Sequence, residues 1–373
     1  AGNLISNIRI GPSSNNPNSI FAVQTRGDQL NTPRSLHTAS TLPDGRILIA
    51  GGYNKQNLAV ASAEIYDPNT GKFLATGEMQ VARIAATATQ LSDGRILMVG
   101  GQDSSGNALS SVEIYDPLSG TFLPGANLGV SRINSTATTL ANGTVLVTGG
   151  YTGAINASST GTPLASAEVY DPSKNTWQVV GSMSTTRRNH IATPLSDGTV
   201  LIAGGYNGSY INTPEIYNPL TQSFLPTATS MEGPRRYPTA NMLPSGKVLW
   251  AGGFKSTTNG ALATTELYTS NSAISFSSSS SMNTARGRHT ATNVAGGDYV
   301  LVVGGFDINS TTLSSAEIYN SSANYFSQSA SMNVPRYRHT DSLLPNGSVL
   351  ITGGDDSSGA LSSAEIYVPF FNY

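Results

Sequence analysis

Short runs of alternating apolar and polar residues recur along the chain, and none follows a helical period. In one representative stretch, the alternating residues 37–42 ("HTASTL") precede a Pro-Asp-Gly turn at 43–45 and the apolar run 46–50 ("RILIA"). Alternation predicts a half-buried strand, whereas a short continuous apolar run predicts a strand buried on both faces. Because the turn residues tolerate the positive φ of a tight hairpin, the stretch predicts two antiparallel strands.

This pattern returns seven times, and each time a double glycine ends the apolar run. The double glycines begin at Gly51, Gly100, Gly149, Gly204, Gly252, Gly304 and Gly353. A variable loop follows each of them, then a third strand such as 62–68 ("SAEIYDP"), then a weaker fourth strand that contains an aromatic residue. Four antiparallel strands in a repeat of about 50 residues are typical of one propeller blade. The sequence therefore predicts an all-β, seven-bladed β-propeller.

The two ends of the chain predict how the ring closes. After Tyr367 only "VPFFNY" remains, which is too short for a fourth strand, while residues 21–30 ("FAVQTRGDQL") stand just before the first repeat. We expect this N-terminal segment to supply the outer strand of the last blade, because closure removes the open sheet edge. We assign 20–373 to a single propeller and 1–19 to an N-terminal tail or linker.

The repeats resemble those of the kelch family, through the double glycine, the Glu-Ile-Tyr strand and the aromatic residue that precedes the next arginine. The resemblance extends over about residues 20 to 369 and implies a β-propeller. The repeats also look like the propeller domain of galactose oxidase, a copper enzyme with a Tyr-His pair at this place in a blade. His339 matches that histidine, but Arg338 stands where the tyrosine should be. The family's redox cofactor also needs a cysteine, and the chain has none, so we do not expect copper radical oxidation.

Two charged residues recur once in every repeat. An arginine opens each repeat, at Arg34, Arg83, Arg132, Arg187, Arg235, Arg286 and Arg336. A glutamate lies in each third strand, at Glu64, Glu113, Glu168, Glu215, Glu266, Glu317 and Glu365. Because a buried carboxylate needs a partner, we interpret these residues as buried ion pairs between blades, and not as seven active sites.

Departures from the repeat mark the candidate ligand site. Repeats 4 to 7 each add an arginine that the first three lack, within three residues of the opening arginine, and five of the seven residues after the double glycines are aromatic. Strand alternation places both positions on one rim, here called the loop face, at the mouth of the central channel. The candidate ligand-binding residues are Arg188, Arg236, Tyr237, Arg288, Arg338, His339, Tyr206, Phe254, Phe306 and Asp355. Arginines beside aromatic rings suit a sugar that carries a carboxylate. The competing interpretation is that the rings pack between blades and the arginines are solvated.

All four histidines occupy one equivalent position, three residues after an opening arginine. His37, His289 and His339 belong to neighbouring blades of a closed ring, so they are candidate ligands for zinc or copper if their nitrogens converge. The alternative is structural, because histidine at this position of kelch repeats caps the first strand. We expect no cofactor, and a divalent metal remains the alternative.

Composition excludes several functional classes. The net charge is −2 and charged residues are 11% of the chain, so nothing predicts a nucleic-acid partner. No apolar run approaches the roughly 18–20 residues of a membrane span, and the absence of cysteine excludes disulfides and thiolate metal sites. A chain of low charge, rich in Ser, Thr and Asn and starting at Ala1, suits a secreted protein, so we expect an extracellular location.

These observations predict a non-catalytic binding or interaction module, with a glycan or protein ligand on the loop face at the channel mouth. Two alternatives stay open. The first is an enzyme or metal protein that uses the histidines and arginines of the mouth. The second is a structural subunit of an extracellular assembly, because residues 3–10 ("NLISNIRI") alternate like a strand and could mediate self-assembly through the tail at 1–19.

Overall fold

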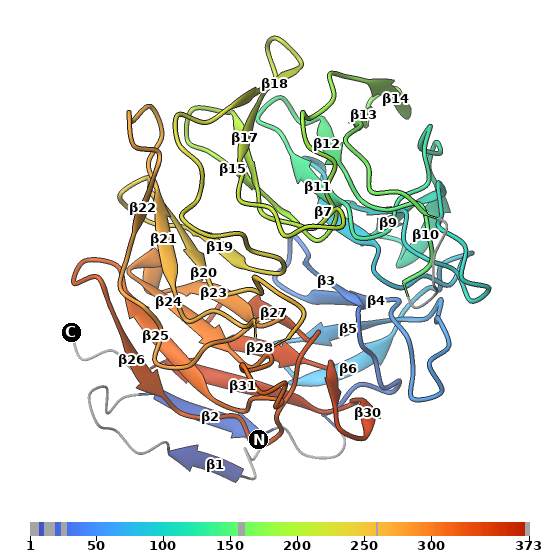
Figure 1. Cartoon of the computed structure of the whole chain (residues 1–373). Helices are drawn as coiled ribbons and strands as arrows, with labels where there is room; N and C mark the ends of the chain where they lie inside the picture. Colours follow the sequence, from blue (N-terminus) through green and yellow to red (C-terminus); the bar gives the residue numbers. More distant parts are fainter. Residues whose placement is uncertain (1–6, 11–18, 24–27, 156–160, 259, 370–373) are drawn as a thin grey trace.

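The computed structural model describes residues 7–10, 19–23, 28–155, 161–258 and 260–369. Within them, seven antiparallel sheets stand around a central axis (Figure 1). The innermost strand of each sheet contacts the innermost strands of both neighbours, including β27 (Thr340–Leu343) with β3 (Thr38–Thr41), so the ring is closed. The predicted seven-bladed, all-β propeller is confirmed.

Blades 1 to 6 each run outward in chain order from the innermost strand. Blades 1 and 2 are β3 (Thr38–Thr41), β4 (Ile47–Ala50), β5 (Ala63–Asp67) and β6 (Lys72–Ala75), then β7 (Thr87–Gln90), β8 (Ile96–Val99), β9 (Val112–Asp116) and β10 (Thr121–Pro124). Blades 3 and 4 are β11 (Thr136–Thr139), β12 (Val145–Thr148), β13 (Ala167–Asp171) and β14 (Thr176–Val179), then β15 (Ile191–Pro194), β16 (Val200–Ala203), β17 (Glu215–Asn218) and β18 (Ser223–Pro226).

Blades 5 and 6 follow the same order, whereas blade 7 takes its two outermost strands from the N-terminal segment. Blades 5 and 6 are β19 (Thr239–Met242), β20 (Val248–Ala251), β21 (Thr265–Tyr268) and β22 (Phe276–Ser278), then β23 (Thr290–Val294), β24 (Tyr299–Val303), β25 (Ala316–Asn320) and β26 (Tyr325–Ser329). Blade 7 is β27 (Thr340–Leu343), β28 (Val349–Thr352), β31 (Ala364–Pro369), β2 (Ser19–Val23) and β1 (Asn7–Ile10). The small hairpin of β29 (Asp355–Asp356) and β30 (Gly359–Ala360) follows β28, and the 3-10 helix η1 (Ala295–Gly297) follows β23. No helix in the described ranges is long and apolar enough to cross a membrane.

The hydrophobic core lies between adjacent blades. Every residue of the second strands is buried or nearly so, as the continuous apolar runs predict. Between blades 6 and 7, for example, Leu301 and Val303 pack against Val349 and Ile351, and Met332 from the link between the blades completes the cluster. Each fully buried large apolar side chain contributes about 1.5–3 kcal/mol, so burial between blades holds the ring together.

The N-terminal segment closes the ring, as predicted. β2 pairs antiparallel with β31, with Phe21 opposite Tyr367, and becomes the fourth strand of blade 7. Figure 1 shows the blue β2 beside the red β31. Part of the predicted tail also joins this sheet, because β1 pairs with β2 as a fifth strand of the same chain. The rest of the tail, 1–6 and 11–18, lies outside the described residues.

The double glycines are required by the backbone and by its neighbours. In blade 1, Gly51 and Gly52 have φ of 67° and 90°, in the region that favours glycine. A Cβ on Gly52 would lie 2.6 Å from the Ser35 carbonyl oxygen, and one on Gly51 would lie 2.6 Å from that of Arg83. Gly52 N–H also donates to the Arg83 carbonyl at 2.9 Å, which joins blade 1 to blade 2.

The recurrent charges form seven buried ion pairs, but each pair lies within one blade. The guanidinium–carboxylate distances are 2.8–3.2 Å and no side chain is more than 4% exposed. Arg34 opens the blade whose third strand carries Glu64, so the prediction of pairs between blades was wrong in that detail. Glu64 also accepts the N–H groups of Asn31 and Thr32, which fastens the incoming link to the blade. The contact between blades comes from the arginine's main-chain carbonyl instead.

Candidate functional site

A ring of seven backbone positions frames the channel mouth on the loop face. These are the second residues after the opening arginines: Leu36, Ala85, Asn134, Asn189, Tyr237, Arg288 and Arg338. All seven have positive φ, between 49° and 55°. Six backbone N–H groups of this ring donate to the carbonyl of the equivalent residue in the preceding blade, at 3.1–3.4 Å. The blades therefore present seven side chains at the mouth in a fixed order, and only their identities differ.

Arginine and tyrosine side chains alternate along one arc of the mouth. Arg188 lies 3.9 Å from the Tyr151 ring centre and 5.5 Å from that of Tyr206. Arg236 lies 4.6 Å from Tyr206 and 4.8 Å from Tyr237, and Arg288 lies 4.6 Å from Tyr237 on its other side. We call these six residues the mouth arc: Tyr151, Arg188, Tyr206, Arg236, Tyr237 and Arg288. Cation–π contacts of this length hold guanidinium groups in place without neutralising them.

Within the described part of the chain, the charges of the mouth arc have no acidic partner. Among the described residues, no carboxylate lies within 4.0 Å of Arg188, Arg236 or Arg288. Arg236 donates to Asn189 Oδ1 at 2.9 and 3.1 Å, and Arg236 and Arg288 both donate to the Tyr237 hydroxyl, at 3.2 and 3.3 Å. Three half-buried cations along one arc of the mouth favour an anion there.

Arg338 differs, because it has a counter-ion of its own. Asp355 is 2% exposed, and its Oδ2 accepts hydrogen bonds from Ser35 at 2.6 Å, Tyr53 at 2.5 Å and Arg338 at 3.5 Å. Arg338 also donates to the Tyr53 hydroxyl at 2.9 Å. Two candidate ligand residues, Arg338 and Asp355, therefore contact each other.

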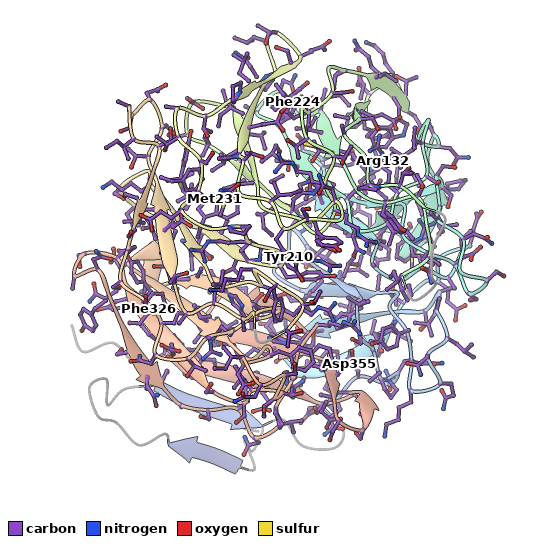
Figure 2. The ribbon with its side chains drawn as sticks, viewed as in Figure 1. Arg132, Tyr210, Phe224, Met231, Phe326 and Asp355 are labelled. Atoms are coloured by element: carbon purple, nitrogen blue, oxygen red, sulfur yellow. The ribbon has the colours of Figure 1, made fainter. Side chains whose placement is uncertain are left out.

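A cavity of about 240 Å³ opens at this mouth. It is lined by Leu36, His37, Ala85, Ala86, Thr87, Asn134, Ser135, Asn189, His190, Ile191 and Tyr237. Tyr237 connects the cavity to the mouth arc, since its hydroxyl contacts the two arginines. In Figure 2, Tyr210, which packs edge-on against Tyr206 at 5.2 Å, lies near the middle of the ring, whereas Phe224 and Phe326 lie toward its outside.

The predicted aromatic residues after the double glycines pack between blades. Tyr206 contacts Arg236, Phe306 stacks on Tyr337 at 4.0 Å between ring centres, and a Cβ on Gly287 would lie 2.2 Å from Phe254. Each ring thus covers the first residue after the opening arginine of the next blade. These rings therefore pack between blades, as the structural interpretation of them expects. Tyr206, Phe254 and Phe306 are also partly exposed at the mouth.

The four histidines face threonines of the preceding blade. Nε2 of His37 lies 2.9 Å from Thr340 Oγ1, and Nε2 of His339 lies 2.8 Å from Thr290 Oγ1. Burial, followed by the charge of the nearby opening arginines, lowers the pKa of His37, His190 and His289 to about 3 and that of His339 well below 6.5. In the described part of the chain, no three His, Asp or Glu residues converge as a metal site would require.

Sequence reasoning missed several residues of the site. Asn189 and Tyr151 belong to the mouth through contacts with arginines of the next blade, which periodicity cannot show. Asp341 does have a sequence signal, because the other six inner strands carry alanine at its position. Its carboxylate accepts a hydrogen bond from Thr292 of blade 6, and burial raises its pKa above the usual 3.8.

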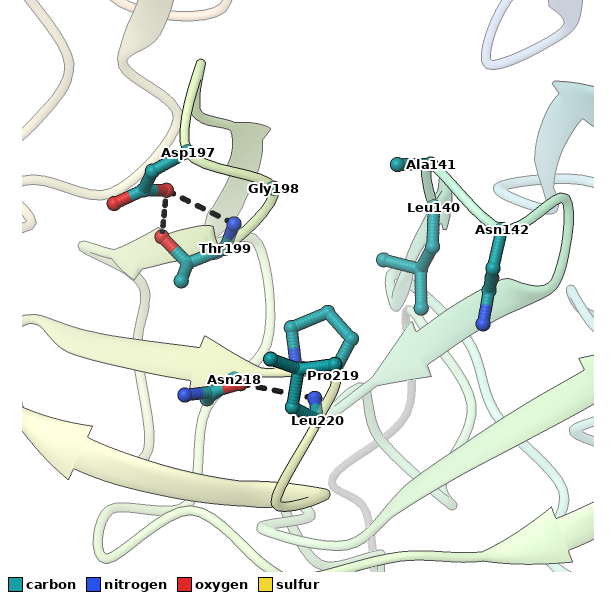
Figure 3. Close-up of a pocket in the computed structure, with 9 residues that line it drawn as sticks. All are labelled: Leu140, Ala141, Asn142, Asp197, Gly198, Thr199, Asn218, Pro219 and Leu220. Atoms are coloured by element: carbon teal, nitrogen blue, oxygen red, sulfur yellow. Dashed lines mark hydrogen bonds between the residues drawn. The ribbon is translucent and has the colours of Figure 1, made fainter.

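A larger hollow of about 350 Å³ lies on the opposite rim, the hairpin face, between blades 3 and 4. Figure 3 shows its walls, with Leu140 on one side and Pro219 and Leu220 on the other. Asp197 is its one charged lining residue, and its Oδ1 is engaged by Thr199. At the mouth, by contrast, the cavity adjoins arginines that have no carboxylate partner among the described residues.

Comparisons with known proteins agree with this fold. The Kelch motif matches residues 33–80, 85–129, 134–184, 187–229 and 287–333, more than half of the chain. A solved fungal alcohol oxidase of the AA5 family, in complex with copper, matches with a TM-score of 0.73 and 20% identity, over 93% of this chain and 76% of that one. At this identity the likeness shows the fold alone. No curated protein matches the chain.

Proposed function

Because the chain belongs to the kelch-repeat family, whose propellers serve as binding and interaction modules, we propose that it binds its ligand at the loop-face mouth, and that this ligand is an acidic glycan. Fold alone does not assign a ligand, so the proposal depends on the site. The observation that carries it is the mouth arc, in which Arg188, Arg236 and Arg288 have no carboxylate partner among the described residues.

An anionic group on the ligand follows from these unpaired charges. A half-buried cation without a counter-ion is costly, and a ligand carboxylate or sulfate offsets this cost when it binds. Guanidinium groups offer paired N–H donors in a plane, which match a carboxylate. Arg338 already contacts Asp355, so the ligand's anionic group is expected at Arg236 and Arg288.

A sugar as carrier of that group is supported by the rest of the mouth. Tyr206 and Tyr237 present aromatic surface, while Asn134, Asn189 and Ser135 place amide and hydroxyl groups around the adjoining cavity. Sites for small polar ligands commonly combine apolar walls with a few convergent polar groups. The low-charge composition supports an extracellular setting, where such glycans occur.

Binding to an array of neutral, uronic, sialic and sulfated glycans tests the proposal. We expect the parent to bind acidic members, and Arg236→Gln/Arg288→Gln to lose at least tenfold in affinity by calorimetry. Arg46→Gln/Arg95→Gln is the matched control, because these two arginines lie on the hairpin face, each paired with an aspartate at 2.6 and 2.8 Å. Equal binding by both double variants would contradict the site. Binding to no glycan, with capture of an acidic peptide instead, would assign the mouth to a protein partner.

A further inference from the structure

We propose that Tyr237 is a proton-abstracting base and that the protein cleaves 1→4-linked uronate chains at the mouth by β-elimination. The proposal rests on the proposed function, since it needs an acidic sugar at Arg236 and Arg288. It goes beyond that function, because it assigns a reaction and a substrate class.

Tyr237 differs in its contacts from the other six residues at the backbone positions that frame the channel mouth. Its hydroxyl accepts hydrogen bonds from Arg236 Nη2 at 3.2 Å and Arg288 Nη2 at 3.3 Å, and both guanidinium groups lie within 4.8 Å of its ring centre. Two cationic donors on one phenol oxygen stabilise its ionised form. Tyr237 is also one of the residues that line the cavity.

The charges around Tyr237 act on its proton in the required direction. Burial alone would raise the pKa of this phenol, but the charges of Arg288 and Arg236, together with the Arg288 hydrogen bond, lower it below its usual 10.0. A phenol that ionises more readily is a better general base near neutral pH. Tyr53, another tyrosine of the mouth, behaves oppositely: burial and its hydrogen bond to Asp355 raise its pKa.

Arg236 and Arg288 also provide the positive charge that must bind the uronate carboxylate before the C5 proton can be removed. Removing a proton next to a carboxylate builds negative charge on the carboxylate oxygens, so that group must be bound by cations or donors. Tyr237 is the only hydrogen-bond partner of the Arg288 side chain among the described residues, so its remaining N–H donors are free to bind a carboxylate. Donors already oriented toward developing charge supply a large part of such catalysis.

The reaction is balanced without any further reagent. The Tyr237 phenolate takes the proton from C5, and the electrons of the C5–H bond form a C4=C5 double bond. The C4–O glycosidic bond breaks with its electron pair on the leaving oxygen. That oxygen takes the proton now on Tyr237, which restores the phenolate. The products are an unsaturated uronate end and a chain with a free hydroxyl group, and nothing is oxidised or reduced overall.

The test uses the full chain with homopolymers of 1→4-linked galacturonate, mannuronate and glucuronate. Product is followed by the ultraviolet absorbance of the C4=C5 bond conjugated to the carboxylate, and binding is measured separately by calorimetry. We expect at least one polymer to give the unsaturated product. Tyr237→Phe is expected to bind it within about threefold of the parent, while its rate falls about 10²–10⁴-fold, the range for a lost general base.

Tyr319→Phe is the matched control, because it removes a phenol hydroxyl that bonds Asn324 at 3.0 Å in blade 6 and contacts none of the candidate ligand residues. It is expected to retain the parent rate. Uronate binding without unsaturated product would overturn the elimination and leave the binding function standing. Product formation by Tyr237→Phe at the parent rate would overturn the role of this residue. Absence of uronate binding would overturn the elimination, whereas the glycan array decides separately whether the mouth binds another acidic sugar.

Discussion

Arginine has two roles in this chain, and the group opposite its guanidinium decides between them. Arg286 is fully buried and bonds Glu317 at 3.1 Å together with the carbonyl of Gly304. Arg288, two residues later, is half-buried and contacts the phenol of Tyr237 without a carboxylate among the described residues. Recurrence separated these roles in the sequence, because an opening arginine such as Arg286 occurs in all seven blades, whereas only four blades carry a second arginine close behind it.

The buried pairs are expected to be strongly coupled to stability. In Glu317→Gln the cation of Arg286 stays buried without a counter-ion, so the free energy of unfolding should fall by about 3–5 kcal/mol in urea titrations. Asp44→Asn is the control, since its partner Arg46 is 36% exposed and surface pairs contribute about 1 kcal/mol or less. Equal effects of the two substitutions would contradict this expectation, because the buried Arg286–Glu317 pair would then stabilise the fold no more than the exposed pair.

The histidines predict a pH dependence of stability. Burial, then the charge of Arg286, lowers the pKa of His289 to about 3, whereas the unfolded chain binds this proton below about 6.5. The stabilisation is therefore complete above pH 6.5 and is lost as the pH falls from 6.5 toward 3. Between pH 7.5 and 5, His289→Gln should lose about 2 kcal/mol less than the parent, at about 1.36 kcal/mol per pKa unit.

Parallel urea titrations at the two pH values measure this difference, and His37→Gln repeats the test at an equivalent position. An identical pH dependence in the parent and both variants would mean that these rings bind a proton at the same pH in the folded protein as in the unfolded chain.

At the scale of elements, periodicity predicted the strands and their order, and turn chemistry predicted the loops between them. "RILIA" became the fully buried β4, and the weak aromatic strand became β6, with Phe73 packed 5.0 Å from Tyr66. These predictions succeeded because the chain repeats one local pattern seven times, once in each blade. The pairing of β1 with β2 was not predicted, because alternation identifies a strand but not its partner.

The strand that closes the ring is expected to control the stability of the whole propeller. Deleting residues 1–23 removes β2 and exposes the edge of β31, so the melting temperature should drop and aggregation should rise. Deleting residues 1–11 removes β1 and leaves the ring closed, so the melting temperature should change little. Thermal melts with light scattering measure both effects. A change in oligomeric state for the shorter deletion would support self-assembly through β1.

For the whole molecule, the formal charge of −2 conceals a local excess of positive charge at the mouth. Acidic residues lie mainly in ion pairs and turns, and Asp355 is the carboxylate that contacts the mouth arginines, through Arg338. The distribution of charge, and not its sum, therefore determines what the loop face attracts.

Removing the internal counter-ion should strengthen the binding of an acidic ligand. In Asp355→Asn, Arg338 keeps its bond to Tyr53 but loses the carboxylate beside it, so the affinity for acidic oligosaccharide should rise severalfold at low salt. The gain should shrink as salt is added, because the added attraction is electrostatic. Calorimetry at two salt concentrations measures this. A lower affinity in the variant would show that Asp355 orients Arg338 for the ligand.

Periodicity alone established the seven blades, the closing strand and the separation of recurrent from exceptional residues, because these depend on local patterns repeated along the chain. Tertiary structure decided the rest. It placed the glutamate of each pair in the same blade as its arginine, turned each histidine toward a neighbouring threonine, and stacked Arg188 on Tyr151 of the preceding blade. Such contacts join residues from different repeats or strands, and their geometry depends on how blades pack around the axis.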